Sequence, residues 1–113
     1  MITGTIVKPG EFADKKDRYE LTINKNNSDA LPHQYRRKNL ISLAIGDITY
    51  EAGVHETRKG VVWISSVLHK KDQRREKARL VDALERVGLK KGDRIRITRN
   101  VNGIFSLSPY RPA

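Results

Sequence analysis

The sequence contains no cysteine. Structural disulfides are therefore excluded, as are zinc knuckles and zinc fingers built on cysteine, and an oxidising compartment is not indicated. The longest largely apolar stretch, residues 40–45, is far shorter than the roughly 20 residues needed to cross a bilayer. Residues 1–4 lack the basic and apolar regions of a signal peptide. These absences predict a cytoplasmic protein with no membrane partner.

Aromatic residues are also few: four Tyr, two Phe and one Trp. A protein that stacks single-stranded nucleic acid needs several exposed rings along its groove. Tyr19 and Trp63 have the phase of strand interiors and are predicted to lie in the core. Tyr35, Tyr50 and Tyr110 could be exposed, but they form no motif. The aromatic content therefore favours binding to duplexes over stacking on single strands.

Residues that could support catalysis are sparse. The three histidines are widely separated and match no metal-ligand spacing, so each is predicted to be a surface residue: His33, His55 and His69. Asp47 with Glu56 comes near the carboxylate pattern of a metal nuclease, but Arg58 stands where a lysine is expected. We predict a non-catalytic domain with no metal site and no cofactor.

What the chain has in excess is positive charge. Lys and Arg together number 23 against 13 acidic residues, a formal net charge of +10 over 113 residues. The cations are spread through segments with folded patterning, and they must lie on the surface, where they attract polyanions. At 37% the apolar content is low but sufficient for a modest core. One domain, residues 1–113, with a nucleic-acid partner is predicted.

Alternation of apolar and polar residues predicts seven short strands. They cover residues 2–7, 18–24, 40–45, 48–54, 61–67, 94–99 and 104–107. Gly46 with Asp47 and the segment 100–103 are hairpin turns. Both faces of segment 61–67 are apolar, which indicates a central strand. A mainly β protein (α+β) with one or two helices follows, in the form of a small barrel whose edges are protected by closure.

The principal helix is predicted over residues 72–87. Leu80, Leu84 and their apolar neighbours recur at helical spacing. Asp72 is the expected N-cap, and Gly88 stands where a left-handed residue ends a helix. A second, short helical turn is expected over residues 33–38.

Several basic clusters lie on predicted loops or flank the helix. Loops that mix Arg and Lys with Asp, Glu and Asn carry the groups that read base edges, whereas loops that bind only phosphate need only cations. The acids Glu11, Asp14, Asp17 and Glu56 therefore indicate sequence readout. Predicted base contacts are Lys15, Lys16, Arg18, His55, Glu56, Arg58 and Lys59. Predicted phosphate contacts are Lys8, Arg36, Arg37, Lys38, Lys70, Lys71 and Arg74.

Residues 79–97 combine an amphipathic helix, the sequence Gly88-Leu89-Lys90-Lys91-Gly92-Asp93 and a strand. This pattern resembles the closing half of the DNA-binding pseudobarrel superfamily, which includes plant B-three domains and effector domains of EcoRII-type restriction endonucleases. The resemblance implies an open seven-stranded pseudobarrel. It also implies two arms in the DNA major groove, at residues 8–19 and 50–63, and a target-recognition module of a restriction endonuclease system. Any nuclease activity would lie in another domain or subunit.

Three other functions remain open. The first is an RNA- or single-strand-binding barrel of the oligonucleotide-binding type. The second is a self-contained nuclease that uses Asp47 and Glu56. The third is a protein-interaction module whose charge serves only solubility.

Overall fold

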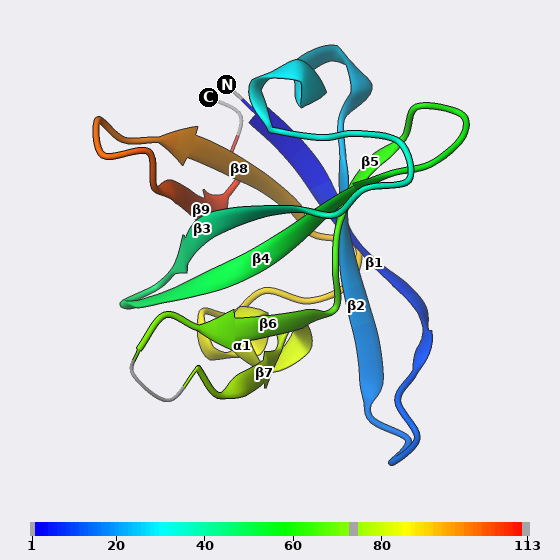
Figure 1. Cartoon of the computed structure of the whole chain (residues 1–113). Coiled ribbons are helices and arrows are strands. Elements are labelled where there is room, and N and C mark those ends of the chain that lie inside the picture. The colour runs from blue at the N-terminus through cyan, green and yellow to red at the C-terminus, as the bar shows by residue number, and fades with distance from the viewer. Residues whose placement is uncertain (1, 73–74, 112–113) are drawn as a thin grey trace.

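The computed structural model describes residues 2–72 and 75–111, which form a mainly β fold with one α-helix (Figure 1). The strands are β1 (Ile2–Glu11), β2 (Asp17–Ile23), β3 (Asn39–Ile45), β4 (Ile48–Glu56), β5 (Val62–Ile64), β6 (Val67–Lys70), β7 (Lys77–Arg79), β8 (Arg94–Arg99) and β9 (Phe105–Pro109). The helices are the 3-10 helix η1 (Lys25–Ala30) and α1 (Leu80–Arg86). The predicted fold class, mainly β with one α-helix, is confirmed at this level.

Seven strands form a closed barrel in the order β3-β9-β8-β1-β2-β5-β4. The ring closes because β3 pairs antiparallel with β4 and parallel with β9, where Leu43 lies opposite Phe105. Closure gives every strand of the ring a neighbour on both sides, so no long edge is left to pair with another chain. The prediction of an open pseudobarrel is therefore wrong. Strands β6 and β7 extend the sheet outside the ring from β4.

The core lies inside the ring and under α1. Tyr19, Leu21 and Ile23 of β2 point inward, as their alternation predicted, and all three are buried. Helix α1 packs against β2 and β7, and its Leu80 and Leu84 are fully buried. Tyr50, which by sequence could have been exposed, is also buried in this core, because its position on β4 faces inward.

The helix begins later than predicted. Residues preceding Leu80 carry no apolar stripe, and Lys77–Arg79 form β7 instead. Asp72 caps no helix, and its Oδ1 accepts a hydrogen bond from the backbone N–H of Arg75. Gly88 follows the helix with φ +80°, as predicted for its C-terminus. Within the described residues, no helix has the length and apolar character needed to span a bilayer.

Two other segments differ from prediction. Segment 61–67 is two strands, because the chain bends at Ser65 and Ser66 between the pairing of β5 with β2 and the pairing of β6 with β7. Residues 33–38 form no helical turn. They fold into a tight loop in which Gln34 bridges to Arg37 and Arg36 adopts a positive φ of 67°.

Candidate nucleic-acid interface

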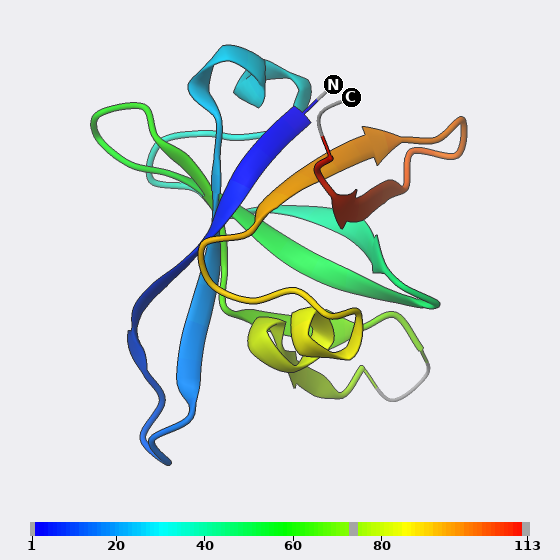
Figure 2. The ribbon, with the colours of Figure 1, turned by 180° about the vertical axis from the view of Figure 1, so that it is seen from behind.

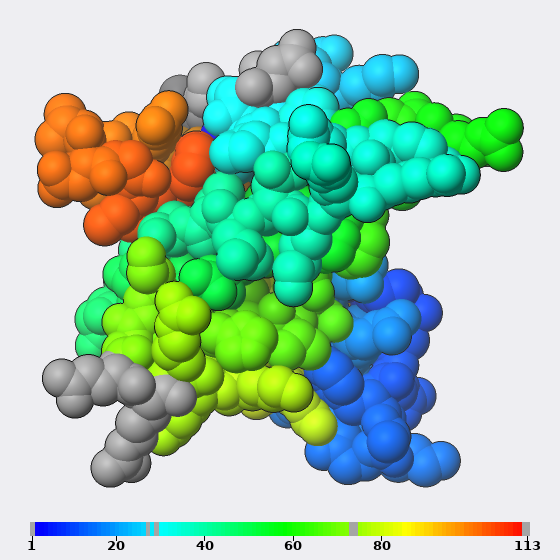
Figure 3. Space-filling view, viewed as in Figure 1, coloured from blue at the N-terminus to red at the C-terminus, as the bar shows by residue number. Residues whose placement is uncertain are grey.

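Two hairpins project from the same side of the barrel. The β1–β2 hairpin (residues 8–19, the N-arm) and the β4–β5 hairpin (residues 50–63, the C-arm) both lie on the right in Figure 1 and on the left in Figure 2. The outline of the molecule is hollowed between them in Figure 3. The two segments that the resemblance assigned to DNA-binding arms therefore share one side of the fold.

The pairing of β2 with β5 sets the direction of the arms. Leu21 lies opposite Ile64 and Thr22 opposite Trp63, and the strands are antiparallel. Beyond this short pairing, β2 leads in one direction to the N-arm and β5 in the other to the tip of the C-arm. At about 3.3 Å per residue, Lys16 lies roughly 20 Å from Thr22 along the strand. The tips are thus set well apart, with the outer face of β2 between them.

The N-arm carries cations at its tip and along its length. Lys15 is exposed at the tip and adopts a positive φ of 74°. Lys8 pairs with Asp17 across the hairpin at 3.0 Å, and the hydrogen bond that its ammonium donates to this carboxylate raises the pKa of Lys8. The Nε of Arg18 is shielded from solvent without an acceptor among the described residues.

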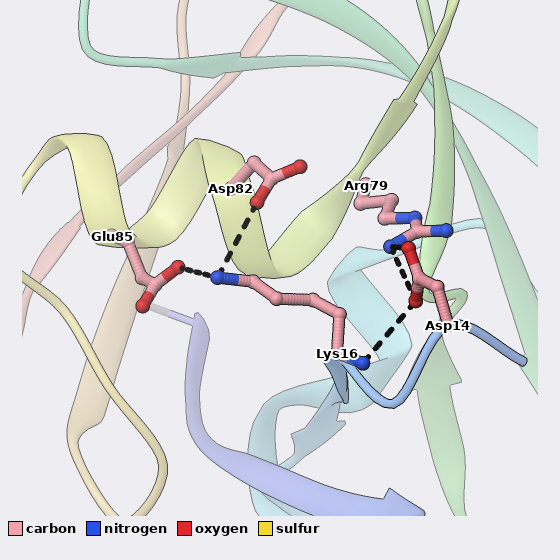
Figure 4. A network of polar contacts seen from close by, with 5 residues as sticks. All are labelled: Asp14, Lys16, Arg79, Asp82 and Glu85. Atoms are coloured by element: carbon pink, nitrogen blue, oxygen red, sulfur yellow. Dashed lines mark hydrogen bonds and ion pairs between the residues drawn. The ribbon is translucent and has the colours of Figure 1, made fainter. Parts of the chain in front are cut away.

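Ion pairs join the N-arm to α1 and β7 (Figure 4). The Asp14 carboxylate accepts hydrogen bonds from Arg79 at 2.9 and 3.1 Å, and the Lys16 ammonium lies 2.9 Å from Glu85 and 3.9 Å from Asp82. The backbone N–H of Lys16 and the Arg79 guanidinium lower the pKa of Asp14, and the bond to Glu85 raises the pKa of Lys16. Lys16, predicted to contact bases, is directed toward the helix and restrains the arm.

Arg79 was missed by the sequence reasoning. Its guanidinium carbon lies 4.1 Å from the centroid of the Phe12 ring in addition to its pair with Asp14. The partners are 65 residues apart, and no local pattern links them. Only the packing of α1 and β7 beside the N-arm brings them together.

The loop of residues 33–38 lies beside the C-arm (Figure 1). Tyr35 forms a parallel bridge with Glu56, and His33 Nδ1 lies 2.7 Å from Glu56 Oε1. These contacts place Arg36, Arg37 and Lys38 next to the arm. Sequence reasoning proposed this basic cluster and the C-arm separately, and the fold brings them together. Glu56 was predicted to contact bases, but its half-buried carboxylate is held by His33, itself half-buried and not the predicted surface residue.

Between this loop and the C-arm lies an open hollow of about 470 Å³. It is lined by Arg36, Arg37, Lys38, His55, Glu56, Thr57 and Trp63. We call it the ring hollow. Arg58 and Lys59 are exposed at the tip of the C-arm and directly follow Thr57, which lines the hollow.

His55 and Trp63 stack in the ring hollow, with ring centroids 4.3 Å apart and planes 17° from parallel. They are directly opposite each other in the β4–β5 ladder, and both are half-exposed. Trp63 was predicted to lie in the core, which is wrong, because Val62 and Ile64 take the inward positions on either side of it. Burial and the charge of Lys38 lower the pKa of His55, which favours the neutral imidazole.

The remaining predicted phosphate contacts lie elsewhere. Lys70 is opposite Tyr50 on β4. Tyr50 is six residues before Glu56 on the same strand, a separation of about 20 Å. Lys71 donates a hydrogen bond to the Ser42 hydroxyl at 2.7 Å. Lys70 ends β6 and Lys71 follows it, and the end of β6 points away from the arms (Figure 1). Arg74 is outside the described residues.

The carboxylates considered for a nuclease are far apart. Asp47 precedes β4 and Glu56 ends it, so the nine residues of the strand separate them by about 30 Å. Over residues 2–72 and 75–111, no three His, Asp or Glu side chains are grouped so that they could hold a metal ion. This pair therefore cannot form one metal site.

Comparison of the chain with protein-family models, with curated proteins and with solved structures finds no match. The resemblance to the DNA-binding pseudobarrel superfamily thus stays a prediction from residues 79–97.

Proposed function

We propose that the chain binds double-stranded DNA with sequence preference, with the N-arm and the C-arm entering the major groove from one side of the barrel. The observation that carries the proposal is the placement of two cation-bearing hairpins on the same side of a closed barrel, with a hollowed outline between them. Base edges are read by protruding elements, and a rigid barrel holds such elements at a fixed spacing.

The arms divide the contacts into two kinds. The proposed groove contacts are the exposed residues of the arm tips and one residue of β2: Lys15, Arg58, Lys59 and Arg18. Lys8 and the loop cations Arg36, Arg37 and Lys38 are the proposed phosphate contacts. Lys70 and Lys71 face away and add to the attractive field without touching this duplex.

We further propose that this chain is the target-recognition module of a restriction endonuclease system. This part of the proposal depends on the resemblance of residues 79–97 and on the absence of an assembled nuclease site at Asp47 and Glu56. The partner in such a system is a nuclease domain or subunit that cleaves the DNA this barrel selects.

The testing experiment is a salt titration of binding to a randomised duplex pool, followed by sequencing of the bound fraction. The slope of log affinity against log salt is about −0.9 per neutralised phosphate, so roughly −5 or steeper is expected. Replacing Arg36, Arg37 and Lys38 by Ala should make the slope shallower by about 2–3. A matched triple variant at Lys71 and at Arg96 and Arg99 of β8 removes the same charge from elements that form neither arm and should change the slope much less. A flat slope, or no enriched sequence, contradicts the proposal.

One observation favours a second candidate, the RNA- or single-strand-binding barrel. Trp63 and His55 form a half-exposed stacked pair beside three cations, which are the components of a base-stacking platform. Competition of a labelled duplex with unlabelled duplex DNA, single-stranded DNA and RNA separates the two functions. Displacement by duplex DNA at the lowest concentration supports the first candidate.

A further inference from the structure

The ring hollow is lined by two stacked rings, and each ring has one face that the other does not cover. His55 and Trp63 are cross-strand neighbours on the outer face of β4 and β5, stacked at 4.3 Å. The free space of the ring hollow is about 470 Å³, which lies within the roughly 300–1,000 Å³ typical of small-molecule pockets. Every nucleobase has a π-face that stacks on such rings independently of its sequence.

The wall of the ring hollow suits a phosphate. Arg36, Arg37 and Lys38 line it within three consecutive residues. The one carboxylate in the lining, Glu56, lies 2.7 Å from His33 Nδ1 and is therefore already partnered. The neutral imidazole of His55 adds no competing charge to the ring pair, because burial and Lys38 keep its pKa low. Cations on one side of aromatic rings match the two halves of a nucleotide.

We propose that the ring hollow binds one unpaired nucleotide of DNA, with the base against the Trp63–His55 pair and the phosphate on the cations of residues 36–38. This inference deepens the proposed function and rests on it: the duplex lies across the arms, and the unpaired nucleotide enters beside the C-arm.

A paired base cannot use this hollow in the same way. In a duplex, neighbouring base pairs cover the faces of each base, and only its edges are open in the grooves. A base that has left the stack, at a bulge, at a strand end or by extrusion, presents its whole face. The site should therefore distinguish a duplex with an unpaired base from a fully paired one.

Trp63 provides the test, because it is the only tryptophan in the chain. Two fluorescein-labelled duplexes are titrated with the protein, and affinity is measured by anisotropy. They have the same sequence except that one is fully paired and the other carries a single additional, unpaired thymidine. In parallel, unlabelled copies are used to follow Trp63 emission. The unpaired thymidine should quench the emission and tighten binding by at least about fivefold. Equal affinity and equal emission for the two duplexes overturn the inference.

Ring variants separate stacking from general charge. Trp63→Leu should bring the affinity ratio of the two duplexes close to one, whereas Trp63→Phe, which keeps a ring, should retain most of the preference. Tyr110→Leu is the matched control, since the Tyr110 ring lies under the guanidinium of Arg94 and does not line the hollow. Thermal melting of each variant checks that the barrel is folded. A Trp63→Leu protein that is folded and keeps the full ratio overturns the inference.

The outcomes also separate this inference from the proposed function. If the paired duplex binds and the unpaired base adds nothing, the duplex function stands and the ring hollow is not a nucleotide site. If single-stranded DNA quenches Trp63 while paired duplex does not bind, the nucleotide site stands and the duplex function fails. Quenching by single-stranded RNA but by none of the DNA ligands contradicts both.

Discussion

One guanidinium nitrogen of Arg79 donates to both oxygens of the Asp14 carboxylate, at 2.9 and 3.1 Å. The contact joins the tip of the N-arm to the strand that leads into α1. A β-hairpin that extends beyond its sheet is otherwise held by little except its own ladder. Asp14 and Arg79 are therefore positioning residues for the N-arm.

Arg79→Ala should loosen the N-arm without unfolding the barrel. The pair is partly solvent-exposed, so its contribution to global stability is small, but the hairpin tip loses its anchor. We expect faster amide hydrogen exchange across residues 11–17 and weaker duplex binding, with the melting temperature nearly unchanged. Arg96→Ala on the outer face of β8 removes the same charge and should leave exchange in the arm unaltered. Equal exchange rates in wild type and Arg79→Ala would contradict the assignment.

A charge swap decides the role of Lys16. Its ammonium lies 2.9 Å from Glu85, so Lys16→Glu should repel α1, release the arm and weaken DNA binding. If Lys16 positions the arm, the double variant Lys16→Glu with Glu85→Lys should recover most of the lost affinity. If Lys16 instead contacts DNA, the second change gives little recovery. Affinities of the four proteins, taken as a double-mutant cycle, measure this coupling.

Gly4→Ala should destabilise the barrel. A Cβ at Gly4 would lie 2.6 Å from the backbone carbonyl oxygen of Thr22, where β1 pairs with β2. Overpacking of this kind costs about 1–3 kcal/mol in the free energy of unfolding. Urea denaturation measures the loss, and Thr5→Ala, at the next and outward-facing position, should cost roughly 0.5 kcal/mol or less. Equal midpoints for Gly4→Ala and wild type would show that β1 and β2 are spaced differently.

Stability should fall as the pH decreases below about 6.5, and His55 should contribute to the fall. Burial and Lys38 lower the pKa of His55 from 6.5 in the folded chain, so the unfolded chain binds a proton more readily. Protonation therefore favours unfolding over a window that begins near 6.5 and extends downward. His55→Gln should have a shallower dependence of unfolding free energy on pH in this window than wild type. His69→Gln serves as the control that retains the His55 contribution.

Arg58→Ala and Lys70→Ala should have different effects on DNA binding, because only the first should change sequence preference. Arg58 lies at the tip of the C-arm, so its loss should relax sequence preference and cost about 1–3 kcal/mol on the preferred site. Lys70 lies on the side away from the arms, so its loss should change binding to all sequences slightly and alike. Selection from a randomised duplex pool with each variant measures the preference. Identical effects of the two variants would show that the C-arm does not read bases.

Much of the barrel follows from local pattern. Alternation along β2 placed Tyr19, Leu21 and Ile23 inside, and turn chemistry placed the hairpin at Gly46, which has φ +64°. Where both faces of a segment were apolar, pattern could not choose between them, and Trp63 was assigned to the wrong face. The predicted start of α1 was also wrong. Asp72 looks like an N-cap in the sequence, but its carboxylate bonds the backbone N–H of Arg75 ahead of the helix, which begins at Leu80.

The sequence by itself determined the side-chain alternation of the strands, the turns between them, the end of the helix at Gly88 and the surface excess of positive charge. These depend on backbone preferences and on burial of residues close together in the chain. Only the tertiary structure decided that β3 pairs with β9, that Lys16 lies beside Glu85, and that residues 36–38 share a hollow with Trp63. Each of these joins segments that are distant in sequence, and their meeting depends on the order of strands that no short turn connects, which no local pattern encodes.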